Sequence, residues 1–98
     1  MRLKGFENIE KIYFIGIGGI SMSALAKFFS VNGFYVCGSE GAKGEETENL
    51  AFYGVKVYIG VDGERAEIRN ADLIVYTDAI QTTNAELIQA RKLKKKVY

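Results

Sequence analysis

The sequence predicts a doubly wound α/β fold with a parallel sheet of about five strands. An apolar, strand-like run over residues 11–17 enters a glycine cluster at 16–19 and leaves it in a helix-forming run. Strand-like and helix-like segments then alternate along the 98 residues, which is typical of a parallel sheet with helices on both faces. Right-handed crossovers predict the strand order 3-2-1-4-5, the arrangement of Rossmann-like domains.

Each element is expected from its local pattern. The first strand covers 11–17, because its nearly continuous apolar run suits a strand buried on both faces. The first helix covers 19–32, where apolar residues recur at helical spacing, and Gly33 follows its end. Further strands are expected at 34–38, 55–59 and 73–76, with a fifth beginning at 97–98, and further helices at 45–53, 62–70 and 83–92.

Loops and helix starts follow from polar residues. Residues 39–43 and 77–83 are predicted as loops. Thr83 and Glu86 have the spacing of a capping box, in which the Glu86 side chain would return to the start of the last helix. Asn84 is expected in the same helix start, as its cap or in its first turn.

The composition limits the classes of function. The chain has no histidine, which excludes a histidine base and a histidine metal ligand, and no metal-ligand spacing is present. The single cysteine, Cys37, cannot form a disulfide within the chain and is expected to be a small buried side chain. A net charge of +1 offers no basic field to a nucleic acid, and no apolar stretch is long enough to cross a membrane. The length suits a single domain over residues 1–98.

Three predicted loops converge where the strand order reverses, at the carboxyl ends of the first and fourth strands. The glycine loop offers main-chain N–H groups and the positive end of a helix dipole, which suit a phosphate. Glu40, after the second strand, is placed to accept hydrogen bonds from a ribose, and Ser39 is placed to bond a hydroxyl or a base edge or its own turn. Thr77, after the fourth strand, is suited to a ligand contact, whereas Asp78 would repel a phosphate and is expected to point away or to cap a turn. No residue pair is typical of a catalytic acid and base, and no P-loop is present, so we interpret the chain as a binding domain.

These loops resemble those of a known family, the N-terminal domain of the Mur ligases. GIGGISMS at 16–23 is similar to that family's G-I-G-G-x-G-M-S loop, and GSE at 38–40 stands where the family has G-S-D. TDAI at 77–80 stands where the family has S-S-A-I, and NAE at 84–86 where it has N-P-E. The resemblance covers essentially the whole chain.

Three positions depart from the family pattern. Ser21 replaces a glycine and narrows the space beside a pyrophosphate. Glu40 replaces an aspartate, so it keeps the charge but reaches further. Asp78 replaces a serine and adds a negative charge near the predicted anion site.

The resemblance implies the first domain of a three-domain, ATP-dependent ligase that joins L-alanine to UDP-N-acetylmuramate in cytoplasmic peptidoglycan precursor synthesis. It implies that this domain holds the UDP part of UDP-N-acetylmuramate, while a central domain outside these residues binds ATP and magnesium. The chain itself is then expected to contain no catalytic residue, metal or cofactor, and not to turn over alone.

The resemblance also implies a role for each loop. The amides of 18–23 would hold the pyrophosphate, with the hydroxyls of Ser21 and Ser23 as extra donors. Ser39 and Glu40 would meet the uridine, and the main chain of 77–80 would line the other side. The predicted substrate-binding residues are Gly16, Gly18, Gly19, Ile20, Ser21, Met22, Ser23, Ser39, Glu40, Thr77, Ala79 and Ile80.

Three alternatives stay open. A murein-peptide ligase shares the loop and joins a preformed peptide to the same sugar nucleotide, so this domain alone does not separate the two. An NAD-binding module is compatible with Glu40, but the absent third glycine and the Met22-Ser23 pair argue against it. A regulatory or interaction domain that has lost its ligand is favoured only by Asp78.

Overall fold

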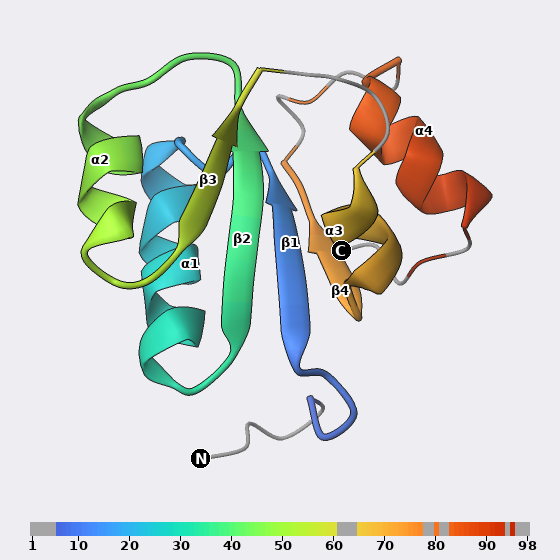
Figure 1. Cartoon of the computed structure of the whole chain (residues 1–98), viewed down its shortest axis with the longest axis horizontal. Helices are drawn as coiled ribbons and strands as arrows, with labels where there is room; N and C mark the ends of the chain where they lie inside the picture. The colour runs from blue at the N-terminus through green and yellow to red at the C-terminus, as the bar shows by residue number, and fades with distance from the viewer. Residues whose placement is uncertain (1–5, 61–64, 78–79, 81–82, 94, 96–98) are drawn as a thin grey trace.

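The computed structural model describes residues 6–60, 65–77, 80, 83–93 and 95. Strands and helices alternate along the chain as the sequence predicts (Figure 1). The strands are β1 (Lys11–Ile15), β2 (Tyr35–Glu40), β3 (Lys56–Ile59) and β4 (Leu73–Val75). The helices are α1 (Ile20–Val31), α2 (Glu45–Ala51), α3 (Ala66–Asn70) and α4 (Ala85–Lys92).

The described strands form one parallel sheet in the order β3-β2-β1-β4. β1 lies in the centre, where Phe14 is opposite Gly38 of β2 on one side and Val75 of β4 on the other. This confirms the doubly wound fold and the 3-2-1-4 part of the predicted order. The fifth strand, predicted to begin at 97–98, lies outside the described residues.

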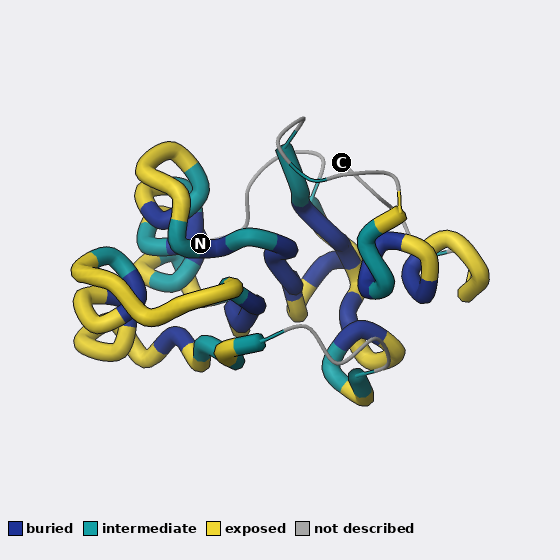
Figure 2. Tube along the Cα trace, turned by 90° about the horizontal axis from the view of Figure 1, so that it is seen from above, coloured by how far each residue is buried: buried dark blue, intermediate teal, exposed yellow. Residues whose placement is uncertain are grey.

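The two faces of the sheet carry two separate hydrophobic cores. Side chains alternate along β1, so Ile12 and Phe14 pack toward α1 and α2, whereas Tyr13 and Ile15 pack toward α3 and α4. Each of these four side chains is at most 1% exposed, and burying a side chain of this size contributes about 2 kcal/mol. Buried residues run through the middle of the molecule, with exposed residues on the outer sides of the helices (Figure 2).

An aromatic group fixes α1 against the sheet. The ring of Phe29 on α1 lies 5.5 Å from that of Phe6 and 5.2 Å from that of Phe34, both measured between centroids. Because α1 follows β1 and connects it to the parallel strand β2, its amino-terminal end lies at the carboxyl edge of the sheet. The helix N–H groups therefore open at the edge where ligands bind in this fold.

Two strands end two residues away from their predicted ends. β1 ends at Ile15, before the predicted 17, because the N–H groups of Gly16 and Ile17 both donate to the Ser39 carbonyl, at 3.0 and 2.8 Å. β2 runs past the predicted end at 38, because Ser39 and Glu40 pair with β3. Both residues therefore lie at the sheet edge and not in the predicted 39–43 loop.

The predicted capping box of α4 is wrong. Asn84 is the cap, and its side-chain oxygen accepts the N–H groups of Glu86 and Leu87 at 2.9 and 3.1 Å. The Glu86 side chain turns into the protein and leaves Thr83 outside the cap. The helix predicted at 62–70 is present as α3, and 61–64 lie outside the described residues.

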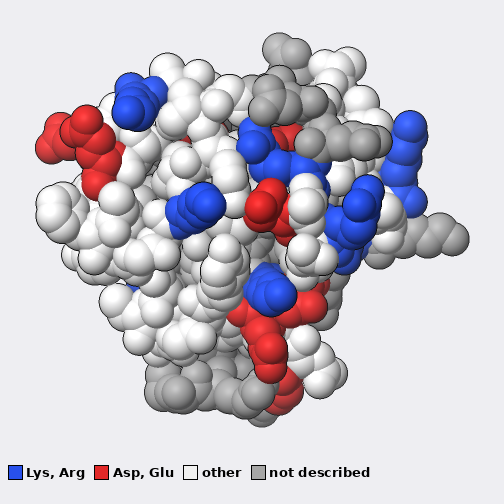
Figure 3. All heavy atoms as spheres, in the orientation of Figure 1, with Lys and Arg blue, Asp and Glu red and all other residues white. Residues whose placement is uncertain are grey.

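The surface carries both signs of charge. On the face shown in Figure 3, lysine and arginine side chains are interspersed with aspartate and glutamate side chains. Across the described residues, none of the helices has the length and apolar character needed to cross a membrane.

Candidate functional site

An open pocket of about 490 Å³ lies at the carboxyl edge of the sheet. It is bordered by the turn between β1 and α1, by the end of β2 and by the segment that follows β4. The described lining residues are Gly16, Gly18, Gly19, Ile20, Ser21, Met22, Glu40, Thr77 and Ile80. All nine belong to the predicted site, because loops that follow neighbouring parallel strands meet at one edge.

The glycine loop ends in an uncapped helix. Gly19 is the N-cap of α1, no side chain caps it, and the first turn contains no acidic residue. Among the described residues, the N–H groups of Ile20, Ser21 and Met22 have no hydrogen-bond acceptor, whereas the N–H of Ser23 donates to the Gly19 carbonyl at 2.7 Å. Three N–H groups at the positive end of a helix dipole form a wall of the pocket, and this arrangement suits an anion.

The two predicted serine donors lie in different environments. Ser21 is exposed and lines the pocket. Ser23 is buried, and its hydroxyl donates to the Ile20 carbonyl at 3.0 Å, within the first turn of α1. Ser21 is therefore available to a ligand in this structure, while the predicted contact of Ser23 stays a prediction.

Glu40 covers part of the loop. Its Oε1 accepts the Gly18 N–H at 2.8 Å, and its Oε2 accepts the Gly41 N–H at 3.2 Å. The side chain is half-buried at the pocket wall. One of the amides predicted to hold a pyrophosphate is thus bonded to the protein's own carboxylate.

The opposite wall is formed after β4. The Ile80 N–H donates to the Thr77 carbonyl at 3.0 Å, which turns the chain back toward the glycine loop. A Cβ placed on Gly16 would lie 3.0 Å from Cδ1 of Ile80, so the end of the Ile80 side chain would have to move to admit one. Gly16 also has a φ of +81°, which side-chain-bearing residues rarely adopt. Ala79, another predicted contact, lies outside the described residues, as does Asp78.

A buried polar network lies behind the pocket, and the sequence analysis missed it. Glu86 of α4 is 0% exposed and accepts hydrogen bonds from the Ser39 hydroxyl, from the Tyr13 hydroxyl at 2.8 Å and from Nε of Arg65 at 3.0 Å. The Arg65 guanidinium also lies 4.6 Å from the centre of the Tyr58 ring. Burial raises the pKa of Tyr13 far above its ordinary value, so its hydroxyl stays a donor.

This network holds the glycine loop in place. Ser39 connects the two, because its hydroxyl donates to Glu86 while its carbonyl accepts the N–H groups of Gly16 and Ile17. Ser39 does not line the pocket, and its predicted contact with a uridine stays a prediction. The only signal in the sequence was the NAE string at 84–86, which the family resemblance includes.

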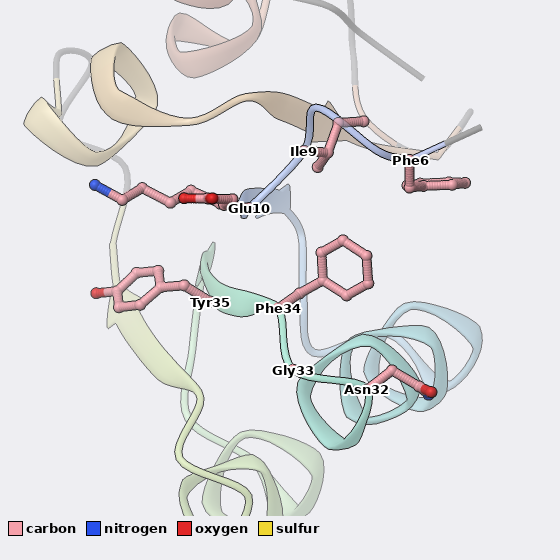
Figure 4. Close-up of a pocket in the computed structure, with 8 residues that line it drawn as sticks. Phe6, Ile9, Glu10, Asn32, Gly33, Phe34 and Tyr35 are labelled. Atoms are coloured by element: carbon pink, nitrogen blue, oxygen red, sulfur yellow. The ribbon is translucent and has the colours of Figure 1, made fainter. Parts of the chain in front are cut away.

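A second pocket, of about 390 Å³, lies at the amino edge of the sheet. In Figure 4 the rings of Phe6 and Phe34 lie at one end of it, and the side chains of Glu10 and Tyr35 extend toward the other. Ligands of doubly wound sheets bind at the carboxyl edge, and this pocket contains no glycine loop or helix N-terminus. The carboxyl-edge pocket is therefore the candidate site.

Within the described part of the chain, the pocket is lined by no cysteine, and no metal cluster lies at it. The thiol of Cys37 is buried, and burial raises its pKa to about 12, so it stays protonated at neutral pH. Across residues 6–60 and the later described segments, no group of three or more acidic, cysteine or histidine side chains is placed to hold a metal ion. The described arrangement is suited to binding an anion.

Comparison with known proteins decides the family. The family model described as "Mur ligase family, catalytic domain" matches residues 11–98. The chain belongs to the Mur ligase family. This confirms the family that the GIGGISMS string at 16–23 indicates.

Curated relatives within the family are full-length ligases. The chain is 43% identical over 86 residues to UDP-N-acetylmuramate–L-alanine ligase of Clostridium novyi (strain NT), a match that covers 88% of this chain and 18% of that protein. It is 49% identical over 84 residues to the ligase of the same name from Clostridium kluyveri (strain NBRC 12016), covering 86% of this chain and 18% of that protein. The chain thus spans less than a fifth of the length of these relatives.

Solved structures agree with the fold. The crystal structure of UDP-N-acetylmuramate:L-alanyl-gamma-D-glutamyl-meso-diaminopimelate ligase from Neisseria meningitides matches with a TM-score of 0.82 and 25% identity, over 92% of this chain and 28% of that one. A murein peptide ligase from Psychrobacter arcticus matches with a TM-score of 0.81 and 22% identity, over 91% of this chain and 18% of that one, and shows the fold alone.

Proposed function

We propose that this Mur ligase domain binds the uridine diphosphate part of UDP-N-acetylmuramate. It would be the first domain of a longer UDP-N-acetylmuramate–L-alanine ligase that works in cytoplasmic peptidoglycan precursor synthesis. The names of the relatives at 43% and 49% identity support this substrate. The observation that carries the proposal is the set of main-chain N–H groups of Ile20, Ser21 and Met22, which lack an acceptor among the described residues at the wall of an open pocket.

In this proposal, each part of the nucleotide contacts a different wall of the pocket. The N–H groups at the start of α1 and the Ser21 hydroxyl hold the diphosphate. Glu40 accepts hydrogen bonds from ribose hydroxyls, and Thr77 and Ile80, with Ala79 between them, border the uridine. Binding at these points fixes the distant muramate carboxylate in position for another domain, which lowers the entropic part of the reaction barrier.

We place ATP and magnesium on other domains of the longer enzyme. The sequence contains no P-loop, and the described acidic residues form no group suited to a metal ion, so we assign no ATP step to this chain. We therefore expect the 98 residues alone to release no phosphate from ATP when L-alanine and UDP-N-acetylmuramate are present. Phosphate release above a protein-free control would contradict this.

A murein-peptide ligase is the second candidate, and the match to the Neisseria meningitides structure favours it. The names of both kinds of relative contain UDP-N-acetylmuramate and differ in the group joined to it. The nucleotide-binding role of this domain is the same under either, so the two candidates are separated only by assaying the full-length enzyme with L-alanine and with the peptide.

Amide signals of the isotopically labelled chain test the proposal. UDP-N-acetylmuramate and UDP are expected to shift the signals of Ile20, Ser21 and Met22, and NAD is expected to leave them unchanged. Signals of 32–35, at the amino-edge pocket, serve as the internal control because they lie at the opposite edge of the sheet. A response to NAD alone would replace the proposal with a dinucleotide-binding module, and no response to any of the three would reject it.

A further inference from the structure

Glu40 supplies the only charged side chain among the described residues that line the candidate pocket. A Cβ built on Gly18 would lie 2.7, 2.9 and 2.9 Å from Oε1, Cδ and Cγ of Glu40. The Glu40 side chain therefore rests directly on the glycine loop. Together with the 2.8 Å hydrogen bond from the Gly18 N–H, this contact places a negative charge where a diphosphate would approach. The carboxylate thus competes with phosphate for the same donor.

This charge is not offset within the pocket. Neither lysine nor arginine occurs among the described lining residues, so a free phosphate would gain the N–H groups of α1 but meet the Glu40 carboxylate. Two like charges that lie close together repel strongly when they are partly shielded from water. A ligand that offers only negative oxygens is therefore at a disadvantage.

A ribose changes this balance. A carboxylate only accepts hydrogen bonds, whereas ribose hydroxyls donate them. A nucleoside diphosphate can give Glu40 new donors in exchange for the Gly18 N–H, which then becomes free for the phosphate. A ligand without a sugar offers no such exchange.

We propose that Glu40 determines the specificity of this pocket by excluding phosphates that carry no ribose and admitting nucleoside diphosphates. The inference rests on the proposed nucleotide-binding function and adds the selection rule. In the structure the Glu40 carboxylate rests on Gly18, and a ligand needs at least a ribose and a diphosphate to open this contact favourably. Selectivity then arises from a repulsive element as well as from attractive contacts.

The affinities of UDP and inorganic pyrophosphate for the 98-residue chain test this. The wild type is expected to bind UDP at least about tenfold more tightly than pyrophosphate, since removing one opposing charge changes affinity by about that factor. Glu40→Gln is expected to bind pyrophosphate about tenfold more tightly than the wild type and UDP no more tightly, so the ratio falls. Glu48→Gln is the matched control, because Glu48 is exposed on α2 and does not line the pocket.

The amide signal of Gly18 gives a readout that needs no ligand. Glu40→Gln replaces the charged acceptor of the Gly18 N–H with a neutral one and is expected to shift this signal. The other amide signals show whether the variant is folded. Glu40→Asp, one methylene shorter, keeps the charge but no longer reaches Gly18, and is expected to move the same signal. Glu48→Gln is expected to leave it in place.

Each remaining outcome overturns the inference. If the wild type binds UDP but the UDP-to-pyrophosphate ratio is the same in Glu40→Gln, the selection rule fails and the proposed function stands. The same holds if pyrophosphate binds the wild type as tightly as UDP does, or if Glu40→Gln only loses UDP affinity. If neither the wild type nor the variant binds UDP, both the inference and the proposed function are rejected.

Discussion

Two carboxylates lie at the carboxyl edge of the sheet, and their surroundings differ. Glu86 is completely buried and accepts hydrogen bonds from the side chains of Tyr13, Ser39 and Arg65. Glu40 is half-buried at the pocket wall and accepts two main-chain N–H groups. A buried carboxylate with a full set of partners is a fixed part of the structure, whereas one at an open pocket can exchange its partners for those of a ligand.

The two carboxylates also act on the same loop from different sides. Ser39 and Glu40 are neighbours at the end of β2, so their side chains point to opposite faces of the sheet. Through Ser39, Glu86 holds the glycine loop in position. Glu40 contacts the loop directly through Gly18. Substitutions on one side should therefore change stability, and those on the other should change ligand selection.

Glu86→Ala is expected to have the largest effect on stability. It leaves the buried Tyr13 hydroxyl and the Arg65 guanidinium, whose side chain is 13% exposed, without their shared acceptor, which costs about 3–5 kcal/mol in comparable buried pairs. Denaturant unfolding followed by circular dichroism measures the loss. Glu48→Ala, at an exposed site on α2, is expected to change the free energy of unfolding by no more than about 0.5 kcal/mol. Equal losses in the two variants would show that the network contributes nothing.

The Glu86 network also shows why part of the structure could not be predicted. The types and order of the elements follow from local patterns, such as the apolar run of β1 and the glycines after it. Glu86, however, is 73 residues from Tyr13 and 47 from Ser39 along the chain, so no local pattern connects them. Local spacing instead predicted a capping box with Thr83, and tertiary contacts override it.

The site was predictable to the extent that topology determines it. Nine predicted residues share one pocket because parallel strands bring their following loops to the same edge. Side-chain direction was not predictable, since it depends on where a strand ends. The pairing of Ser39 with Tyr58 extends β2 and turns the Ser39 hydroxyl toward α4, away from the pocket.

A comparison of Gly16→Ala with Gly54→Ala separates the effect of loop shape on UDP binding from the effect of backbone strain on stability. Both glycines have positive φ, +81° and +76°, so each substitution is expected to cost about 1–3 kcal/mol of stability. A Cβ at Gly16 also meets Ile80 at 3.0 Å, whereas one at Gly54 meets nothing within 4 Å. Only Gly16→Ala is therefore expected to weaken UDP binding, by about tenfold, because it displaces a wall of the pocket. An equal change in UDP affinity for both variants would refute the assignment of the pocket.

Asp72→Asn is expected to have the smallest effect and completes the comparison of carboxylates. Like Glu40, Asp72 accepts two main-chain N–H groups, from Glu10 and Lys11 at 2.9 and 3.0 Å, but it does so at the amino edge of the sheet. The site is exposed and screened by water, so the loss at neutral pH is expected to be about 0.5–1 kcal/mol. UDP affinity is expected to stay unchanged, because the proposed site lies at the opposite edge of the sheet.

The pH dependence of this variant identifies the cause of the loss. The N–H groups of Glu10 and Lys11 hold the pKa of Asp72 below its ordinary value of 3.8. A carboxylate whose pKa is lowered by folding stabilises the protein above its unfolded pKa, and this contribution disappears as the pH falls through the folded value. The difference in unfolding free energy between the wild type and Asp72→Asn should therefore shrink as the pH falls below about 4. A difference that stays constant in acid would mean that the loss comes from altered packing, and Asp72 would then no longer serve as the charged counterpart of Glu40.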